Sequence, residues 1–367
     1  MYDVIVIGGG IAGLISSNLL SRSGLHVALF EKKEYPFHRV CGEYVSNEVK
    51  PFLTKNNLFP DEINPSSITD FQLTSTNGKK ASLRMDMGGF GISRYSFDHF
   101  LYKQAIESGV EVFQSSTVSE VNFLQDYFEV KSKGETYQSR WVIGSHGKRS
   151  TLDKGRRFMQ KKSPYIGVKY HIKTDFPSDL IALHNFKNGY CGISKVEQDI
   201  YNLCYLSHRD NLKKHQSIEA MESHLLHENP FLKSIWQNSE FLFEKPLVIN
   251  EISFAKKELI CDHILMCGDT AGMITPLCGN GMAMAIHASK ILTEILIQNW
   301  NQGDFNRTQI ENQYIRMWNK QFSKRLLIGR TLQQLFGAKW SSNLAVKLLQ
   351  NESIGHAIVK LTHGPTL

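Results

Sequence analysis

The chain has 367 residues, of which 41% are hydrophobic and 21% charged, and its formal net charge is +7. This length exceeds what one small core needs and indicates two interlocked domains of a globular protein. No apolar run reaches about eighteen residues, so no spanning helix is expected, and the apolar N-terminus lacks the basic segment of a signal peptide. Six cysteines at irregular spacings favour reduced thiols in a cytoplasm.

The first thirty or so residues have the pattern of a βαβ unit. YDVIVIG and HVALFEK are strand-like runs, and the stretch between them carries apolar residues at helical spacing. Gly8, Gly10 and Gly13 form G-x-G-x-x-G at the strand-to-helix turn, and Glu31 ends the second strand. Such a turn lets backbone N–H groups approach a pyrophosphate, while the acid accepts hydrogen bonds from ribose hydroxyls. The sequence therefore predicts dinucleotide binding.

The middle of the chain is rich in strand patterns. Residues 68–85 predict a hairpin with its turn at Asn77–Gly78, and a helix is expected to begin near Ser96. Residues 165–207 alternate apolar and polar side chains, as half-buried antiparallel strands do. Residues 258–269 predict one strand that leads into a glycine-rich stretch.

These elements predict an α/β fold. It consists of a Rossmann-like dinucleotide-binding domain, an inserted antiparallel-sheet domain for the substrate, and appended C-terminal helices. The expected boundaries are 1–67, 90–160 and 258–300 for the first domain, 68–89 and 161–257 for the second, and 301–367 for the helices.

The stretch CGDTAGMITPLCGNGMAMAIHASK combines Gly-Asp, a proline and Gly-Asn-Gly immediately before a helix. Asp269 can accept hydrogen bonds from ribityl hydroxyls of an extended dinucleotide, and Pro276 stiffens the loop. Gly279–Asn280–Gly281 can bring N–H groups against a flat ring, where the dipole of the following helix favours negative charge on reduced flavin. This stretch therefore predicts noncovalent FAD as the resident cofactor.

Taken together, these segments resemble the p-hydroxybenzoate hydroxylase superfamily of FAD-dependent oxidoreductases, and within it the geranylgeranyl-reductase-like branch. The family's R-x-x-x-D-x-x-L-like segment corresponds to RYSFDHFL, with Arg94 and Asp98, and its Cys-Gly segment corresponds to RVCGEYVS. By this resemblance, Arg39 lies near the cofactor, and Cys41 and Gly42 lie near the ring. The predicted FAD contacts are Gly8, Gly10, Gly13, Glu31, Arg39, Cys41, Gly42, Arg94, Gly268, Asp269, Pro276, Gly279, Asn280, Gly281 and Met282.

The chain departs from the family pattern in two places. The family usually has an Asp-Gly motif that serves flavin and NAD(P)H, whereas this chain has His146–Gly147. The missing carboxylate argues against tight NADPH contacts, although the family pattern makes NAD(P)H the expected electron donor; Lys148 and Arg149 are either phosphate ligands or solvated cations. The Y-x-W-x-F-P cavity motif corresponds to GYCGIS, in which Gly192 replaces tryptophan and leaves room for a bulkier substrate.

The resemblance implies redox chemistry on a hydrophobic small molecule. Three functions stay open. The first is a monooxygenase that hydroxylates a phenolic or polyketide-type substrate through a flavin C4a-hydroperoxide in a dry site. The second is a reductase of an isoprenoid or lipid double bond, and the third is an FAD-bearing electron-transfer or binding protein. Cys41, Tyr190 and His287 are candidate catalytic residues, each with the alternative of an ordinary packed side chain.

The excess positive charge lies in the C-terminal region. Cations and large apolar residues recur there on opposed helical faces, as Arg316, Lys320 and Lys324 against Trp318, Phe322 and Leu326. Such a helix either docks on the core with a charged outer face or lies on an anionic membrane. The expected location is the cytoplasm, with peripheral contact at the inner membrane face as the alternative. No nucleic-acid partner and no metal site are predicted.

Overall fold

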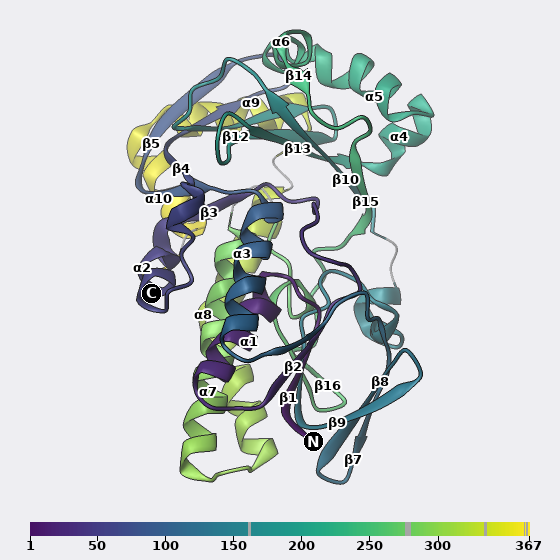
Figure 1. Cartoon of the computed structure of the whole chain (residues 1–367). Coiled ribbons are helices and arrows are strands. Elements are labelled where there is room, and N and C mark those ends of the chain that lie inside the picture. Colours follow the sequence, from purple (N-terminus) through teal and green to yellow (C-terminus); the bar gives the residue numbers. More distant parts are fainter. Residues whose placement is uncertain (161–162, 276–279, 334–335, 363, 365) are drawn as a thin grey trace.

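The structure is a computed structural model that describes residues 1–367 except 161–162, 276–279, 334–335, 363 and 365. Figure 1 shows two sheets, one above the other, with the long helices α7 (Gly281–Gln302) and α8 (Arg307–Gln333) beside the lower sheet. The chain begins in the lower sheet, and the C-terminus lies near α2 (Lys50–Lys55).

The lower sheet is the Rossmann-like part. Its order is β16-β17-β9-β1-β2-β6, and the strands from β17 to β6 run parallel. The strands are β1 (Tyr2–Ile7), β2 (Val27–Phe30), β6 (Glu111–Phe113), β9 (Glu135–Gly144), β16 (Ile260–Cys261) and β17 (Ile264–Met266), with β7 (Val118–Leu124) and β8 (Tyr127–Ser132) added through β9. The central strands are apolar because α1 (Ile11–Arg22), α3 (Arg94–Glu107) and α7 share one core with them.

The upper sheet is mixed, with the order β14-β10-β13-β12-β11-β4-β5-β3 and β15 beside β10. Its strands are β3 (Tyr44–Ser46), β4 (Ser66–Thr74), β5 (Lys80–Gly91), β10 (Tyr165–Lys173), β11 (Leu180–Phe186), β12 (Gly189–Lys195), β13 (Tyr201–His208), β14 (Glu240–Phe241) and β15 (Leu247–Ile252). Three helices pack on one apolar face, α4 (Arg209–His215), α5 (Ile218–Leu225) and α6 (Pro230–Asn238). The other face carries the polar residues of β10 and β13 and a second apolar cluster.

The C-terminal region is helical, as predicted, with α8, α9 (Lys339–Leu349) and α10 (Glu352–Thr362). Trp318 and Phe322 of α8 are buried in the main core, whereas Arg316, Lys320 and Lys324 are exposed. The interpretation of α8 as a helix docked on the core is therefore confirmed. Within the described residues, none of the helices combines the length and apolar character that crossing a bilayer requires.

Short 3-10 helices complete the chain, at η1 (Asn47–Val49), η2 (Asp61–Ile63), η3 (Thr151–Asp153), η4 (Arg157–Gln160), η5 (Leu226–Glu228) and η6 (Gly268–Thr270).

The predicted α/β fold is confirmed, and three details of the prediction are wrong. Helix α3 begins at Arg94, because the hydroxyl of Ser93 caps it by accepting from the backbone N–H of Ser96 at 3.1 Å. Residues 258–269 form the β16–β17 hairpin, because Asp262 and His263 adopt positive φ angles of 48° and 64° and turn the chain. Strand β3 pairs with β5 in the upper sheet, although the prediction placed residues 1–67 in the lower domain.

Candidate cofactor site

Four neighbouring parallel strands end at one edge of the lower sheet. Gly8 follows β1, Glu31 follows β2, Ser145 and His146 follow β9, and the Cys267–Asp269 segment follows β17. In open α/β sheets, ligands bind in the crevice outside the carboxyl ends of the strands. The fold therefore brings the N-terminal motif (Gly8–Gly13 with Glu31) and the late motif (the stretch that begins at Gly268–Asp269) to one edge of the sheet.

In the glycine-rich turn, Gly8 and Gly13 are closely packed against neighbouring atoms, whereas Gly10 faces open space. Gly8 has φ +103°, and a Cβ there would lie 2.5 Å from the carbonyl oxygen of Ser145. A Cβ at Gly13 would overlap the Gly8 carbonyl, so this glycine lets α1 pack closely. At Gly10 the nearest described atom to a Cβ would be a guanidinium nitrogen of Arg94, 3.5 Å away. The space above Gly10 is therefore open and bordered by a cation.

The N-terminus of α1 begins at this open position. Gly10 is the N-cap residue, no side chain caps the helix, and no acidic residue lies in its first turn. The helix thus presents its first N–H groups and the positive end of its dipole to the crevice. This arrangement suits a pyrophosphate.

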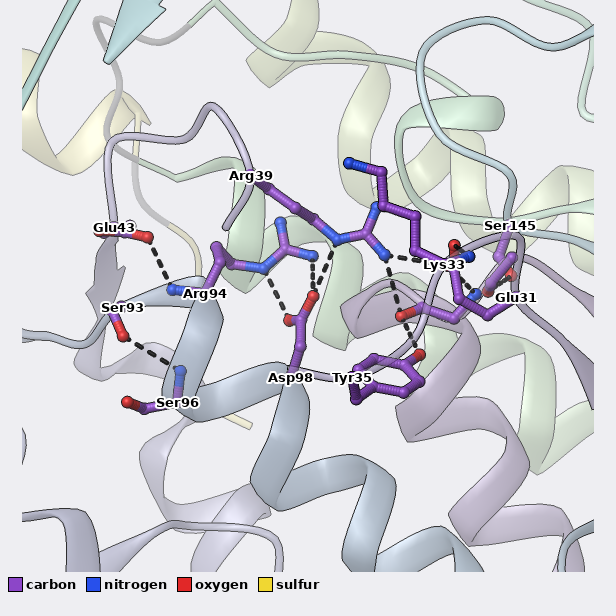
Figure 2. Close-up of polar contacts among 12 residues, drawn as sticks. Glu31, Lys33, Tyr35, Arg39, Glu43, Ser93, Arg94, Ser96, Asp98 and Ser145 are labelled. Carbon is purple, nitrogen blue, oxygen red and sulfur yellow. Dashed lines mark hydrogen bonds and ion pairs between the residues drawn. The ribbon is translucent and has the colours of Figure 1, made fainter. Parts of the chain in front are cut away.

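An ion network connects the second strand to α3, as Figure 2 shows. Glu31 Oε2 accepts the N–H of Gly9 at 2.9 Å and Arg39 Nη2 at 3.0 Å. Arg39 Nε donates to Asp98 at 3.0 Å, and Arg94 donates to both Asp98 oxygens at 2.7 Å. Burial alone would lower the pKa of Arg94, but Asp98 raises it above its usual value. Two arginine side chains, Arg39 and Arg94, therefore lie beside the predicted phosphate position and are oriented by carboxylates.

The late motif packs directly on the glycine-rich turn. Gly268 has φ +62°, and a Cβ there would lie 2.8 Å from Cβ of Ala12 in α1. Ser289 of α7 also donates to the carbonyl oxygen of Ala12 at 2.9 Å. Asp269 is half-buried, and burial raises the pKa of its carboxyl, while Lys257, Arg94 and Lys148 oppose that shift.

The start of α7 supplies a second uncapped helix N-terminus. Asn280 is its N-cap residue and makes no side-chain cap, and Met282 in its first turn is buried. A Cβ at Gly281 would approach only Ile274 among the described residues, at 4.0 Å. The predicted contacts Pro276 and Gly279 lie outside the described residues.

The turn that replaces the family's Asp-Gly motif is held by the protein itself. His146 Nε2 lies 3.2 Å from Asp153 Oδ1, and Lys148 Nζ donates to the carbonyl oxygen of Asn250 at 2.7 Å. Arg149 forms an ion pair with Glu251. These contacts tie His146 to η3 and tie Lys148 and Arg149 to β15, so both cations already have partners within the protein.

The three catalytic candidates lie in different surroundings. Cys41 is half-buried beside the exposed Gly42, and burial raises the pKa of its thiol. Tyr190 is buried in the apolar cluster of the upper sheet, with its ring centroid 5.7 Å from that of Phe336. His287 packs edge-on against Phe322 of α8 at 5.3 Å, and burial, with Arg325 and Lys290, lowers its pKa to about 4. These contacts fit the alternative of a packed histidine for His287.

Three residues near the site were missed by the sequence analysis. In a half-buried strand the polar side chains of residues 165–173 would face solvent, yet Lys169 and His171 are buried against Glu43. The only available signal was the position of Glu43 directly after the Cys-Gly segment. No group of His, Cys, Asp or Glu within the described part of the chain is placed to hold a metal ion.

Comparisons with known proteins agree with this geometry. The family of NAD(P)-binding Rossmann-like domains matches residues 6–48. The chain is 25% identical over 343 residues to the digeranylgeranylglycerophospholipid reductase of Methanocaldococcus jannaschii, covering 89% of this chain and 84% of the relative. The crystal structure of a geranylgeranyl bacteriochlorophyll reductase-like protein from Thermoplasma acidophilum superposes with a TM-score of 0.79 at 18% identity, over 98% of this chain and 94% of the other.

A halogenase has the same fold. The crystal structure of halogenase PltM in complex with phloroglucinol and FAD superposes with a TM-score of 0.77 at 15% identity, over 98% of this chain and 85% of the halogenase. The predicted resemblance is therefore confirmed: the chain has the Rossmann-like fold of geranylgeranyl-reductase-like proteins and flavin-dependent halogenases, and its sequence is similar to those of archaeal lipid reductases.

Proposed function

We propose that this chain is an oxidoreductase that binds FAD noncovalently at the carboxyl edge of the lower sheet. The observation that carries the proposal is the contact between the two glycine-bearing turns, in which Gly268 lies against Ala12 at the start of α1. No described atom lies within 4 Å of a Cβ built at Gly42, and Gly10 is open apart from Arg94. The residues present therefore fit an extended dinucleotide.

Each part of the site has a role in this proposal. The α1 N-terminus and Arg94 bind the pyrophosphate, Glu31 orients the adenine ribose, and Asp269 accepts hydrogen bonds from ribityl hydroxyls. The α7 N-terminus favours negative charge near the ring. FAD, when bound, supplies hydride transfer or oxygen activation.

The first test is the chromophore of the purified chain. We expect a yellow protein with a flavin spectrum, and heat or acid is expected to release free FAD, because no covalent link is proposed. NAD(P)H is the proposed electron donor, so NADH or NADPH is expected to bleach the flavin band anaerobically. A colourless protein that also fails to take up added FAD would contradict the proposal.

For the reaction, we propose hydroxylation of a hydrophobic phenolic or polyketide-type molecule. On one face of the upper sheet, Leu73, Leu183, Tyr190 and Leu206 belong to a buried apolar cluster that α9 covers, and Met273 and Phe336 pack against this cluster. Met273 lies four residues after Asp269, so the cluster extends to the glycine-rich stretch that follows β17. An apolar wall excludes water from the reacting centre. A phenolic compound together with FAD in a halogenase of the same fold supports this substrate class.

Reduction of an isoprenoid or lipid double bond is an equally supported alternative. Its support is the similarity to a digeranylgeranylglycerophospholipid reductase over 89% of this chain.

Product analysis distinguishes the two reactions. The reduced protein is mixed anaerobically with phenols of increasing size or with a geranylgeranyl lipid, and labelled dioxygen is then admitted. Hydroxylation predicts label in the product and no turnover before oxygen enters. Saturation of the lipid double bond under anaerobic conditions would contradict hydroxylation and support the reductase.

Peripheral contact with an anionic membrane through the C-terminal helices is a further proposal. Arg316, Lys320 and Lys324 form an exposed cationic face on α8, and Trp340 of α9 is 76% exposed. Lys and Arg attract anionic lipids, and tryptophan prefers the membrane interface.

Flotation with vesicles tests this contact. We expect co-flotation with phosphatidylglycerol vesicles at low salt, its loss at high salt, and weaker binding of Trp340→Ala. Vesicles of phosphatidylcholine alone are the control. Failure to bind phosphatidylglycerol at low salt would exclude the membrane contact.

A further inference from the structure

Three buried polar side chains meet beneath the loop Arg39–Glu43. Glu43 and Lys169 are 0% exposed, and His171 is 3% exposed. Glu43 Oε1 accepts from Lys169 Nζ, and Glu43 Oε2 accepts from His171 Nε2 at 2.7 Å. Lys169 and His171 are alternate residues of β10, so both point to the same face of the upper sheet.

Strand β10 does not require the buried Glu43–Lys169 ion pair for its stability. The other residues of β10, Ile166, Val168, Tyr170 and Ile172, fill the opposite apolar face of the sheet. Taking a lysine and a glutamate out of water carries a large desolvation cost, and replacing such pairs with apolar residues is often neutral or stabilising. Burial alone would raise the pKa of Glu43, yet Lys169 and His171 hold it at about 2. Glu43 is therefore a fixed anion rather than a proton donor.

The same residues hold the backbone of the Arg39–Glu43 loop. Lys169 Nζ donates to the carbonyl oxygen of Arg39 at 3.1 Å. Asn202, which lies opposite His171 on β13, donates to the carbonyl oxygen of Cys41 at 3.1 Å. The upper sheet therefore fixes the loop at several points along its length.

Glu43 also fixes the loop from within. Its φ is +53°, in the left-handed region that a glutamate rarely adopts, so the surrounding contacts must maintain it. Its carboxylate accepts the backbone N–H of Arg94 at 2.7 Å, at the start of α3 (Figure 2). The side chain of Arg39, at the other end of the loop, reaches Glu31 and Asp98. The loop is thus held by the lower domain through Arg39 and by the upper sheet through Lys169 and His171.

We propose that Lys169 and His171 are positioning residues, which act through Glu43 to set the Cys41–Gly42 backbone against the flavin ring. This role rests on the proposed binding of FAD. It implies that the upper sheet, and not the Rossmann-like part alone, determines where the Arg39–Glu43 loop lies.

The test separates positioning from stability by removing both charges together. Lys169→Met alone leaves the buried Glu43 carboxylate without its ammonium partner and with only the His171 contact on this strand, so it is expected to lower the melting temperature. The double variant Glu43→Gln with Lys169→Met has no such charge and is expected to fold with a melting temperature near that of the wild type. For this double variant we expect a Kd for FAD at least tenfold higher and an altered visible circular dichroism of the bound flavin. Lys173→Met, on the same strand but exposed, is the matched control and is expected to leave both unchanged.

Wild-type FAD affinity and an unchanged flavin spectrum in the double variant would overturn the proposal. His171→Asn, which keeps the Glu43–Lys169 pair, is the second variant should the double variant not fold. A shifted flavin dichroism at an unchanged melting temperature supports positioning, and an unchanged spectrum contradicts it. A wild-type chain that binds no FAD would instead contradict the proposed function itself, so the two failures are distinguishable.

Discussion

Replacing Gly10 with leucine is expected to abolish FAD binding while leaving the apo-protein folded. Gly10 has φ −86°, which any residue adopts, and among the described residues a Cβ there would meet only Arg94, at 3.5 Å. The rest of a leucine side chain would fill the open space in front of the α1 N-terminus, where the pyrophosphate is proposed to bind. We expect the Kd for FAD to rise by about 100-fold or more, which corresponds to roughly 3 kcal/mol. Fluorescence titration of the apo-protein with FAD measures this change.

The neighbouring glycine provides the contrast. Gly13→Ala is expected to lower the melting temperature of the apo-protein, because its Cβ would overlap the Gly8 carbonyl. Gly10→Leu is expected to leave that temperature near the wild-type value. Tight FAD binding by Gly10→Leu would show that the pyrophosphate does not lie at this turn.

Replacing Asp269 with leucine is expected to abolish FAD binding by removing a contact to the ribityl half of the cofactor. The carboxylate is half-buried at the end of β17 and is the proposed acceptor for ribityl hydroxyls. Leucine removes that acceptor and also removes the negative charge that interacts with the nearby cations Lys257, Arg94 and Lys148. We expect the protein to purify without flavin, as measured by the ratio of flavin to protein absorbance.

Asp269→Asn is the matched control for this change. Asparagine keeps the shape and one oxygen acceptor, so it is expected to retain FAD with about tenfold weaker affinity, or ~1.4 kcal/mol. Stoichiometric FAD in Asp269→Leu would remove Asp269 from the cofactor site.

The cofactor turns could be predicted from the sequence because their chemistry is local. Gly8, Gly10 and Gly13 lie between a strand and a helix, and the structure has a positive φ at Gly8 and close packing at Gly13, as their spacing implies. Asp269 could be assigned to the same site only by assuming that the strand before it, β17, belongs to the same sheet. The contact between Gly268 and Ala12 supports that assumption.

The Glu43 cluster could not be predicted, because alternation along a strand does not reveal what covers its polar face. Lys169 and His171 alternate with apolar residues as exposed side chains would, yet the Arg39–Glu43 loop buries them. This contact joins residues more than 120 positions apart in the sequence. The β16–β17 hairpin was missed for a different reason, since its turn consists of Asp262 and His263 and contains no glycine or proline to mark it.

The central claim is that two distant turns hold opposite halves of one FAD molecule. A crystal structure of the chain with FAD tests it most directly. The account predicts the adenine ribose at Glu31, the pyrophosphate above Gly10, and the ribityl chain at Asp269. An FAD molecule bound without contact to either turn, or bound only at one of them with its other half in solvent, would contradict it.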